Sequence, residues 1–136
     1  MALLPDRLSQ TLRRCEGYGE LGMWHQAWEE LEDLPDQDRT RLPALIWRVR
    51  TLVGMGFHRN AVSLGGSLVR TFPASVGVKG VMCEALIALA RSETQTGDPQ
   101  VARECLAQCL EIDPDRRQGI LSMPEFRHFA SALLGD

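Results

Sequence analysis

The sequence predicts an all-α protein, a solenoid of three helical hairpins with one further helix at the C-terminal end. Three observations lead to this fold class. A pattern of Gly, four residues and Ala begins at Gly22, Gly56 and Gly97, and each copy opens a run with helical apolar periodicity. The first two copies are separated by the period of about 34 residues that is typical of stacked helix–turn–helix units, and the third follows after a somewhat longer interval. In the last two copies a Pro follows the Ala at the same distance.

The residues of this pattern have physical roles in a helical hairpin. The Gly ends one helix and permits the tight turn before the next. The Ala lies where two antiparallel helices cross closely, because a larger side chain would push them apart. The Pro stops the second helix. These roles divide the chain, taken as a single domain over residues 1–136, into repeats over approximately 6–35, 41–73 and 75–114 and a capping helix over 122–135.

Apolar spacing sets the helices of the first two repeats. The expected helices cover residues 6–21, 23–34, 43–55 and 58–70, with a polar loop at 36–40. The Gly65-Gly66 pair costs the last of these helices about 1 kcal/mol per Gly relative to Ala. We interpret the pair as a place of close packing against another backbone.

The third repeat places its first helix between Pro73 and Gly97. Residues 76–81 alternate like a strand, but their two Gly and the helical surroundings favour a helix with a loosened start. The second helix opens with Asp98-Pro99, an N-cap residue followed by Pro in the first position.

The C-terminal tail has the signs of an amphipathic helix. Ser122 and Glu125 have the spacing of a capping box. An apolar stripe follows at Phe126, Phe129, Ala130, Leu133 and Leu134. A solenoid leaves its last repeat exposed, so we expect this helix to cap it. The alternative is that the stripe recruits a partner.

With these marks the chain resembles the tetratricopeptide repeat family. Family repeats carry Gly at the turn, an aromatic or acidic residue just after it, Ala early in the second helix and a closing Pro. The matching residues are Trp24, Asp98, Ala27, Ala61, Ala102, Pro73 and Pro114. The resemblance covers roughly residues 8–114 and implies a right-handed solenoid. The first repeat departs from the pattern, because Pro35 follows its Ala much sooner than the closing Pro of the other two repeats.

The resemblance also implies a binding surface, since the first helix of each family repeat lines a concave groove that holds a peptide or a partner's helix. Counted back from each turn Gly, the groove positions are Glu16, Glu20, Ile46, Arg50, Val53, Ile87, Arg91 and Gln95. Arg50 and Arg91 precede their turn Gly at the same spacing and are therefore equivalent. Both suit an acidic ligand, or instead pair with Glu16 or Glu20 across the stack. The Lys and Asn with which some family members clamp a terminal carboxylate are not found at these positions.

Charge is distributed unevenly along the chain. Residues 1–40 carry a net charge of −5, residues 41–80 carry +6 with no acidic residue, and residues 81–136 carry −4. This pattern fits either electrostatic contact between stacked neighbours or a basic patch for an acidic partner. An acidic chain without an aromatic-interleaved basic run argues against nucleic acid. No apolar run approaches the length of a membrane span. We expect a cytoplasmic protein that does not bind membranes.

Residues with catalytic or metal-binding chemistry do not form a known motif. We expect the four Cys to be small buried hydrophobes rather than disulfides or zinc ligands. The stretch from Asp113 to Glu125 looks like a calcium loop, but Gly119 is seventh and Glu125 thirteenth, each one place too late. We interpret His25 and His58 as surface residues. We therefore expect no catalytic residue, no metal and no cofactor.

These observations predict a protein-interaction module, an adaptor, scaffold or chaperone-like protein that is not an enzyme. Its expected partner is another protein or peptide, with an acidic character. One alternative is a structural protein that assembles with copies of itself into a homo-oligomer, which repeated stacking surfaces also suit. Another is a small enzyme whose site the sequence does not reveal.

Overall fold

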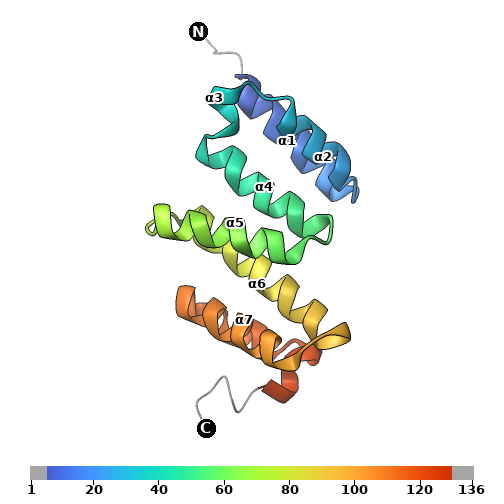
Figure 1. Cartoon of the computed structure of the whole chain (residues 1–136), viewed down its shortest axis with the longest axis vertical. Coiled ribbons are helices and arrows are strands. Elements are labelled where there is room, and N and C mark those ends of the chain that lie inside the picture. Colours follow the sequence, from blue (N-terminus) through green and yellow to red (C-terminus); the bar gives the residue numbers. More distant parts are fainter. Residues whose placement is uncertain (1–5, 130–136) are drawn as a thin grey trace. The chain divides into compact units, whose positions relative to one another are not determined.

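The computed structural model describes residues 6–129, and every regular element among them is helical (Figure 1). The elements are α1 (Arg7–Glu20), α2 (Trp24–Glu32), α3 (Asp36–Arg39), α4 (Leu42–Gly54), α5 (His58–Thr71), α6 (Val76–Thr96), α7 (Pro99–Ile112), the 3₁₀ turn η1 (Pro114–Arg116), α8 (Arg117–Leu121) and the 3₁₀ helix η2 (Pro124–Phe129). The all-α class is confirmed. The chain divides into two compact units, an N-terminal unit that ends at Phe57 and a C-terminal unit that begins at His58. The boundary falls at the turn of the expected second repeat, and the single-domain arrangement stays a prediction.

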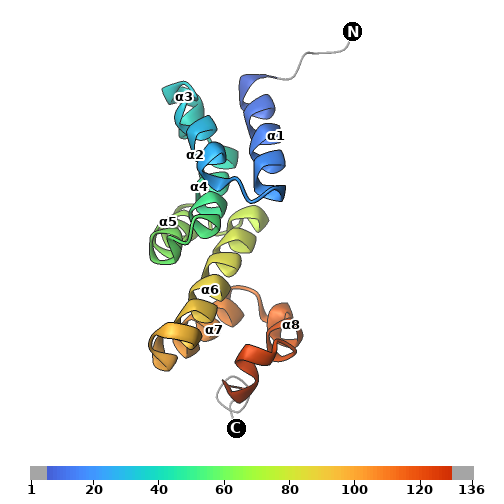
Figure 2. The same cartoon turned by 90° about the vertical axis from the view of Figure 1, so that its right-hand side faces the viewer.

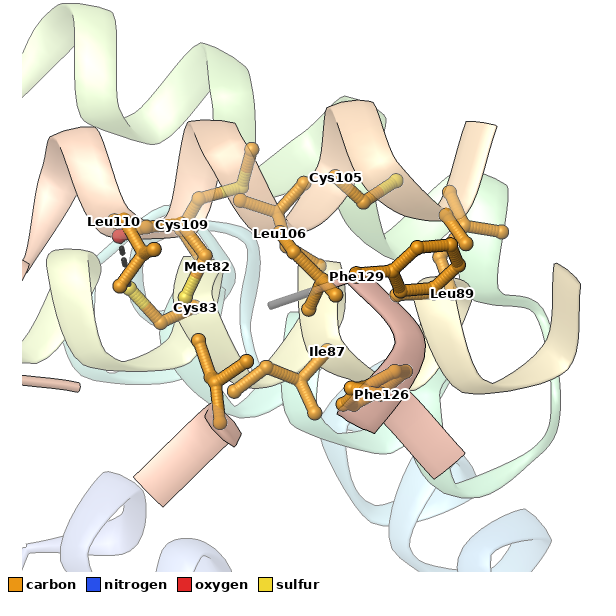
Figure 3. Packing of buried hydrophobic residues seen from close by; sticks show 14 residues of the cluster. Met82, Cys83, Ile87, Leu89, Cys105, Leu106, Cys109, Leu110, Phe126 and Phe129 are labelled. Carbon is orange, nitrogen blue, oxygen red and sulfur yellow. Dashed lines mark hydrogen bonds between the residues drawn. The ribbon is translucent and has the colours of Figure 1, made fainter. Parts of the chain in front are cut away.

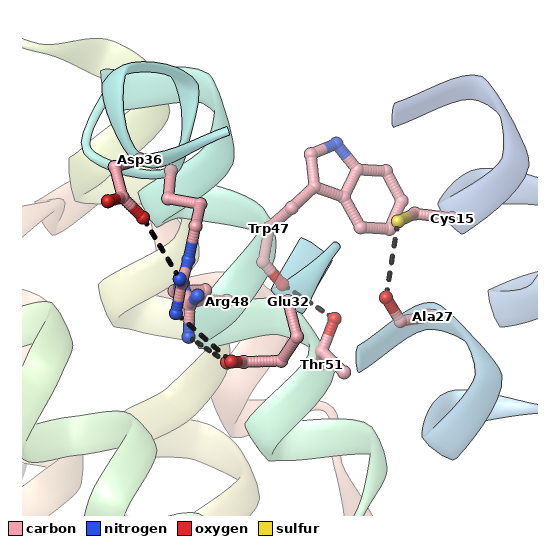
Figure 4. Close-up of polar contacts among 8 residues, drawn as sticks. Cys15, Ala27, Glu32, Asp36, Trp47, Arg48 and Thr51 are labelled. Carbon is pink, nitrogen blue, oxygen red and sulfur yellow. Dashed lines mark hydrogen bonds and ion pairs between the residues drawn. The ribbon is translucent and has the colours of Figure 1, made fainter. Parts of the chain in front are cut away.

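The N-terminal unit consists of the α1–α2 hairpin with α3 and α4. Helix α4 contacts both α1 and α2. The core is formed by Leu8, Cys15, Ala27, Leu31, Leu34 and Ala44. The two hairpin helices approach closely at Ala27, which is fully buried, and the Cys15 thiol donates a hydrogen bond to the Ala27 carbonyl at 3.5 Å (Figure 4). A side chain longer than Ala would separate the helices at this point, as the repeat pattern predicts.

Gly22 and Gly56 end α1 and α4 in the same way. Both have a left-handed backbone, with φ of 72° and 88°. In each turn the N–H of the residue after the Gly bonds to a carbonyl in the last turn of the helix, at 2.8 Å and 2.9 Å respectively. This is the Schellman arrangement, and Gly is favoured there because it has no Cβ to strain a left-handed residue. The predicted role of these two glycines is confirmed.

Gly97 has a different role from the other two. Its φ is −132°, so the left-handed argument does not apply. Instead, the Glu93 carboxylate folds against Gly97 and accepts the N–H of Asp98 at 2.8 Å. A Cβ on Gly97 would collide with that carboxylate. Arg59 of α5 holds the same carboxylate at 2.6 Å. At the third turn, therefore, a side-chain acceptor takes the place of a helix carbonyl.

Trp24 joins the three long helices of the N-terminal unit. Its indole lies against the backbone of Gly19 in α1, where a Cβ would come within 2.8 Å of the ring. At Gly54, the last residue of α4, a Cβ would come even closer. The two glycines therefore provide the space in which the ring packs.

Residues 36–39 form the one-turn helix α3, so the prediction of a loop at 36–40 was wrong. Pro35 stands at the N-cap, and two acidic residues lie in the first turn, where they favour helix formation. Glu32 accepts hydrogen bonds from Arg39 at 3.1 Å and from Arg48 at 2.9 Å (Figure 4). These bonds fix α3 against α4.

The C-terminal unit is built on α6, the longest helix at 21 residues, which contacts both α5 and α7. The Ser75 hydroxyl accepts the N–H of Val78 at 3.2 Å, and the chain is helical from Val76 onward despite its strand-like alternation. The core lies between α6, α7 and η2 (Figure 3). The Asp98 side chain caps α7, as predicted, by accepting the N–H of Gln100 at 2.9 Å.

The Gly65-Gly66 pair of α5 is only half explained by close packing. Gly65 is buried against α6, and a Cβ there would lie 2.8 Å from the sulfur of Met82. A Cβ on Gly66 would meet nothing closer than 3.7 Å. The packing interpretation is therefore confirmed for Gly65 and wrong for Gly66.

The chain after α7 folds into short helical pieces, η1, α8 and η2, which lie beside α6 and α7 (Figure 2). The predicted capping box was wrong. Ser122 ends α8, and its hydroxyl donates to the Gly119 carbonyl at 2.9 Å. Phe126 and Phe129 are buried, as their stripe predicts. Residues 130–135 of the expected capping helix lie outside the described residues.

Candidate functional site

The expected groove residues of the N-terminal unit lie on α1 and α4. Glu16 and Glu20 are exposed, one helical turn apart on α1. Ile46, Arg50 and Val53 are half-buried and follow helical spacing on α4. The Arg50 guanidinium lies 4.7 Å from the centre of the Trp47 ring, in cation–π geometry. We call Ile46, Trp47, Arg50 and Val53 the α4 strip, a surface that combines apolar side chains with one cation.

The expected groove residues of the C-terminal unit lie on α6. Ile87, Arg91 and Gln95 are each four residues apart, so they follow one face of the helix, and we call them the α6 strip. Ile87 is only 8% exposed and belongs to the core, whereas Arg91 and Gln95 are exposed. The three residues therefore share a face of α6, and their role as groove residues stays a prediction.

The α6 strip is already partly covered by the chain's own C-terminal segment. The Arg91 Nε donates to Glu125 Oε1 at 2.8 Å, and its Nη2 contacts the sulfur of Met123 at 3.6 Å. Phe126 lies beside Ile87 in the core (Figure 3). The pKa of Glu125 is lowered, first by its own backbone N–H and then by the Arg91 guanidinium. Within the C-terminal unit the partner of Arg91 is thus Glu125, and the alternative in which Arg50 and Arg91 pair with Glu16 or Glu20 stays a prediction.

Sequence reasoning missed Glu125 as a partner of this strip. Its spacing from Ser122 indicated a capping box, in which the carboxylate would bond to the backbone of its own helix. The signal that could have revealed the contact is the adjacent Phe126, because burial of an aromatic side chain against α6 brings the neighbouring carboxylate close to that helix.

Ion pairs use much of the positive charge of residues 41–80. Arg41 pairs with Asp6 and Asp38, Arg48 with Glu32 and Arg59 with Glu93. In each pair the acid comes from the acidic flanks of the sequence. These contacts favour the interpretation of the charge pattern as electrostatic fit within the fold.

Two open cavities contain charged residues. One, of about 310 Å³, is lined by Val76, Lys79, Gly80, Ile112, Asp113 and Arg116. The other, of about 370 Å³, is lined by Asp36, Arg39, Thr40, Leu45 and Arg48. In both, an Arg on the wall is already paired with an Asp on the same wall, at 3.3 Å and 3.4 Å.

All four Cys are free and buried, so their predicted burial is confirmed. Burial raises the pKa of Cys15 to about 11. The pKa of Cys109 is raised by a hydrogen bond with the Cys83 thiol and by burial, whereas that hydrogen bond lowers the pKa of Cys83. Burial also raises the pKa of Cys105. Three of the four thiols are therefore held in the neutral form, which is a poor nucleophile.

Over residues 6–129, no three His, Cys, Asp or Glu side chains are grouped so that they could hold a metal ion. His25 is exposed and His58 half-buried. Within the same range no helix has the length and apolar character needed to cross a membrane. Comparisons of the chain with protein-family models, with curated proteins and with solved structures find no match.

Proposed function

We propose that this protein is a non-catalytic interaction module of tetratricopeptide type, and that its α4 and α6 strips bind a peptide or helix of another protein. The two strips have the same arrangement along the chain. In each, an Ile and an Arg precede the turn Gly at the same spacing, as Ile46 and Arg50 on α4 and Ile87 and Arg91 on α6. In the three-hairpin solenoid that the period predicts, these are equivalent positions on the first helices of neighbouring repeats.

Local structure supports the proposal of a repeat. The left-handed turns at Gly22 and Gly56 have the same hydrogen bonds and are separated by one repeat period, about 34 residues. The three alanines of the pattern, Ala27, Ala61 and Ala102, are all fully buried. Agreement of this kind is expected if the copies of the pattern are repeated units, of which the third has a different turn at Gly97.

The observation that carries the functional proposal is the occupied α6 strip. Arg91 holds a carboxylate and Ile87 lies beside an aromatic ring, both from a short non-α segment of the chain. A surface that binds this combination within its own chain has the chemistry to bind it on another. Charge-assisted contact gives orientation and on-rate, and the apolar anchor gives affinity.

The test is a peptide array probed with the full chain. Peptides of about 12 residues, varied in acidic and aromatic content, are long enough for about three helical turns. Binders are then measured by fluorescence anisotropy against the wild type, Arg50→Glu and Arg91→Glu. We expect weaker binding by both variants and by the wild type at high salt, because salt shortens the Debye length from about 10 Å at 0.1 M.

Arg103→Glu provides the matched control, because Arg103 is an exposed Arg on α7 and belongs to neither strip. Binding that is unchanged in Arg50→Glu and Arg91→Glu, or reduced equally in Arg103→Glu, would place the interface elsewhere. Sedimentation over a concentration range tests the self-assembly alternative, which predicts a concentration-dependent oligomer without any peptide.

A further inference from the structure

We infer that residues 123–129 act as an internal ligand that blocks the α6 strip in the resting chain, and that the partner displacing it carries the same chemistry, an acidic residue followed by aromatic residues. The inference rests on the proposed function, since it names the ligand and the regulation of that same surface. It adds an autoinhibitory contact between two parts of the C-terminal unit.

The polar half of the contact lies at the surface. Arg91 and Glu125 meet at 2.8 Å, but their side chains remain 47% and 28% exposed. Exposed pairs of this kind contribute little to stability, because water and salt compete with them. A carboxylate from another chain can therefore replace Glu125 without leaving a buried charge unpaired.

The apolar half of the contact consists of two anchors. Phe126 is fully buried and Phe129 is 3% exposed, and their rings are stacked at 6.4 Å between centroids. Figure 3 shows Phe126 beside Ile87 and Phe129 beside Leu89, both on α6. Aromatic side chains in desolvated pockets are among the residues that carry most of the binding energy at interfaces.

The covering segment is less firmly built than the helices beneath it. It is a 3₁₀ helix of six residues, a form with poorer hydrogen-bond geometry than the α-helix. Its neighbours η1 and α8 are three and five residues long. Helices α6 and α7, in contrast, pack along each other as a hairpin of 21 and 14 residues. Local opening of the segment therefore requires less free energy than unfolding of the hairpin.

The geometry of the internal ligand defines the ligand of the strip. Glu125 and Phe126 are adjacent, and Phe129 follows three residues later. A partner that supplies a carboxylate to Arg91 and a ring beside Ile87 needs the same order, Asp or Glu, then Phe, then a second aromatic residue three positions on. Because the strip is free only in the open fraction of molecules, the apparent affinity of such a partner is reduced by that fraction.

The experiment uses the full chain and a fluorescein-labelled peptide with blocked ends and the sequence of residues 122–129. We expect the peptide to bind the Glu125→Lys chain about two- to fivefold more tightly than the wild type, the factor that loss of one exposed charge pair produces. Glu125→Gln should also bind the peptide more tightly than the wild type, but by a smaller factor. Glu111→Lys, the same change at an exposed site on α7, should bind like the wild type.

A charge reversal identifies the contact. On the Arg91→Glu chain, a peptide with Lys in place of its Glu should bind more tightly than the original peptide, and on the Glu125→Lys chain the order should be the opposite. Because both peptides are compared on the same folded chain, a general loss of stability cannot produce this reversal. Circular dichroism of each variant shows that its helices are intact.

The outcomes separate the inference from the proposed function. The inference is overturned if the peptide binds the wild type and Glu125→Lys equally. It is also overturned if the preference for the Glu-containing or the Lys-containing peptide is the same whether residue 91 is Arg or Glu. If array peptides bind through Arg91 but the peptide of residues 122–129 binds neither the wild type nor any variant, the inference fails and the proposed function stands. If no peptide of either kind binds any chain, both fail. A dimer that Glu125→Lys converts to a monomer in sedimentation would show that the segment serves a second copy, which also overturns the inference.

Discussion

The two adjacent glycines of α5 allow a sharp test of how α5 and α6 pack. Both Gly65→Ala and Gly66→Ala replace a helical Gly by Ala, which favours the helix by about 0.8–1 kcal/mol. The effect on the unfolded chain is the same for neighbouring positions in one helix. The difference in the free energy of unfolding between the two variants therefore reports which atoms the added Cβ contacts in the folded protein.

The structure sets the expected magnitudes. At Gly66 the nearest atoms are 3.7 Å and 3.8 Å away, which is ordinary van der Waals contact, so Gly66→Ala should stabilise the protein by about 0.5–1 kcal/mol. At Gly65 the new Cβ would lie 2.8 Å from the sulfur of Met82, a residue that is buried and only 1% exposed, so the Met82 side chain or the helices must shift. Overpacking of this kind costs about 1–3 kcal/mol. After subtraction of the helix gain, Gly65→Ala should be neutral to destabilising by about 2 kcal/mol.

Urea denaturation followed by far-ultraviolet circular dichroism measures both variants against the wild type. A double-mutant cycle with Met82→Ala adds a second readout, because removal of the Met82 side chain should relieve the cost of Gly65→Ala and leave Gly66→Ala unaffected. If Gly65→Ala is as stable as Gly66→Ala, or if the cycle shows no coupling between Gly65 and Met82, the close approach of α5 and α6 at this point is refuted.

Two further predictions concern the turns. Gly54→Ala should destabilise the N-terminal unit by about 1–3 kcal/mol and shift the Trp24 fluorescence, because the new Cβ would collide with the indole. The control Gly17→Ala, with nothing within 4 Å, should be neutral or stabilising in the same thermal melts, and equal effects of the two changes would contradict the placement of the ring. The pKa of Glu93 is lowered from 4.5, first by the turn amide and then by the Arg that it pairs with, so its ionised form stabilises the folded protein above pH 4.5. This stabilisation should be lost as the pH falls through the folded pKa, and Glu93→Gln should be less sensitive to acid than the wild type in urea titrations at several pH values. An identical acid dependence of the two proteins would mean that the third turn does not use this carboxylate.

The local structure was largely predictable because its causes are local. The left-handed turns at Gly22 and Gly56 depend on a missing Cβ, and the cap at Asp98 depends on one carboxylate reaching an amide two residues on. Apolar periodicity located the long helices to within a few residues. The one-turn helix α3 was not predicted, because a single turn is too short to show a period and depends on the bonds from Arg39 and Arg48 to Glu32.

The sequence predicted which of the candidate residues share a face of α6, but not which contacts these residues make. Ile87, Arg91 and Gln95 share a face of α6 because their spacing of four residues requires it. Nothing in that spacing shows that Arg91 is paired with Glu125, far along the chain from it. The sequence pattern around Glu125 favoured a capping box, and packing of Phe126 into the core directed the carboxylate to Arg91 instead.

By itself, the sequence determined the helical class, the places where the long helices begin and end, and the burial of the three alanines of the pattern. Each of these follows from side chains within one or two helical turns of one another. Only the tertiary structure decided which charges meet and which surface is covered. Arg59 with Glu93 and Arg91 with Glu125 are both pairs of residues distant in sequence, and their contact depends on how α6 packs against its neighbours. The reason is physical, since a local pattern specifies the face on which a side chain lies, whereas its partner is specified by the packing of whole helices.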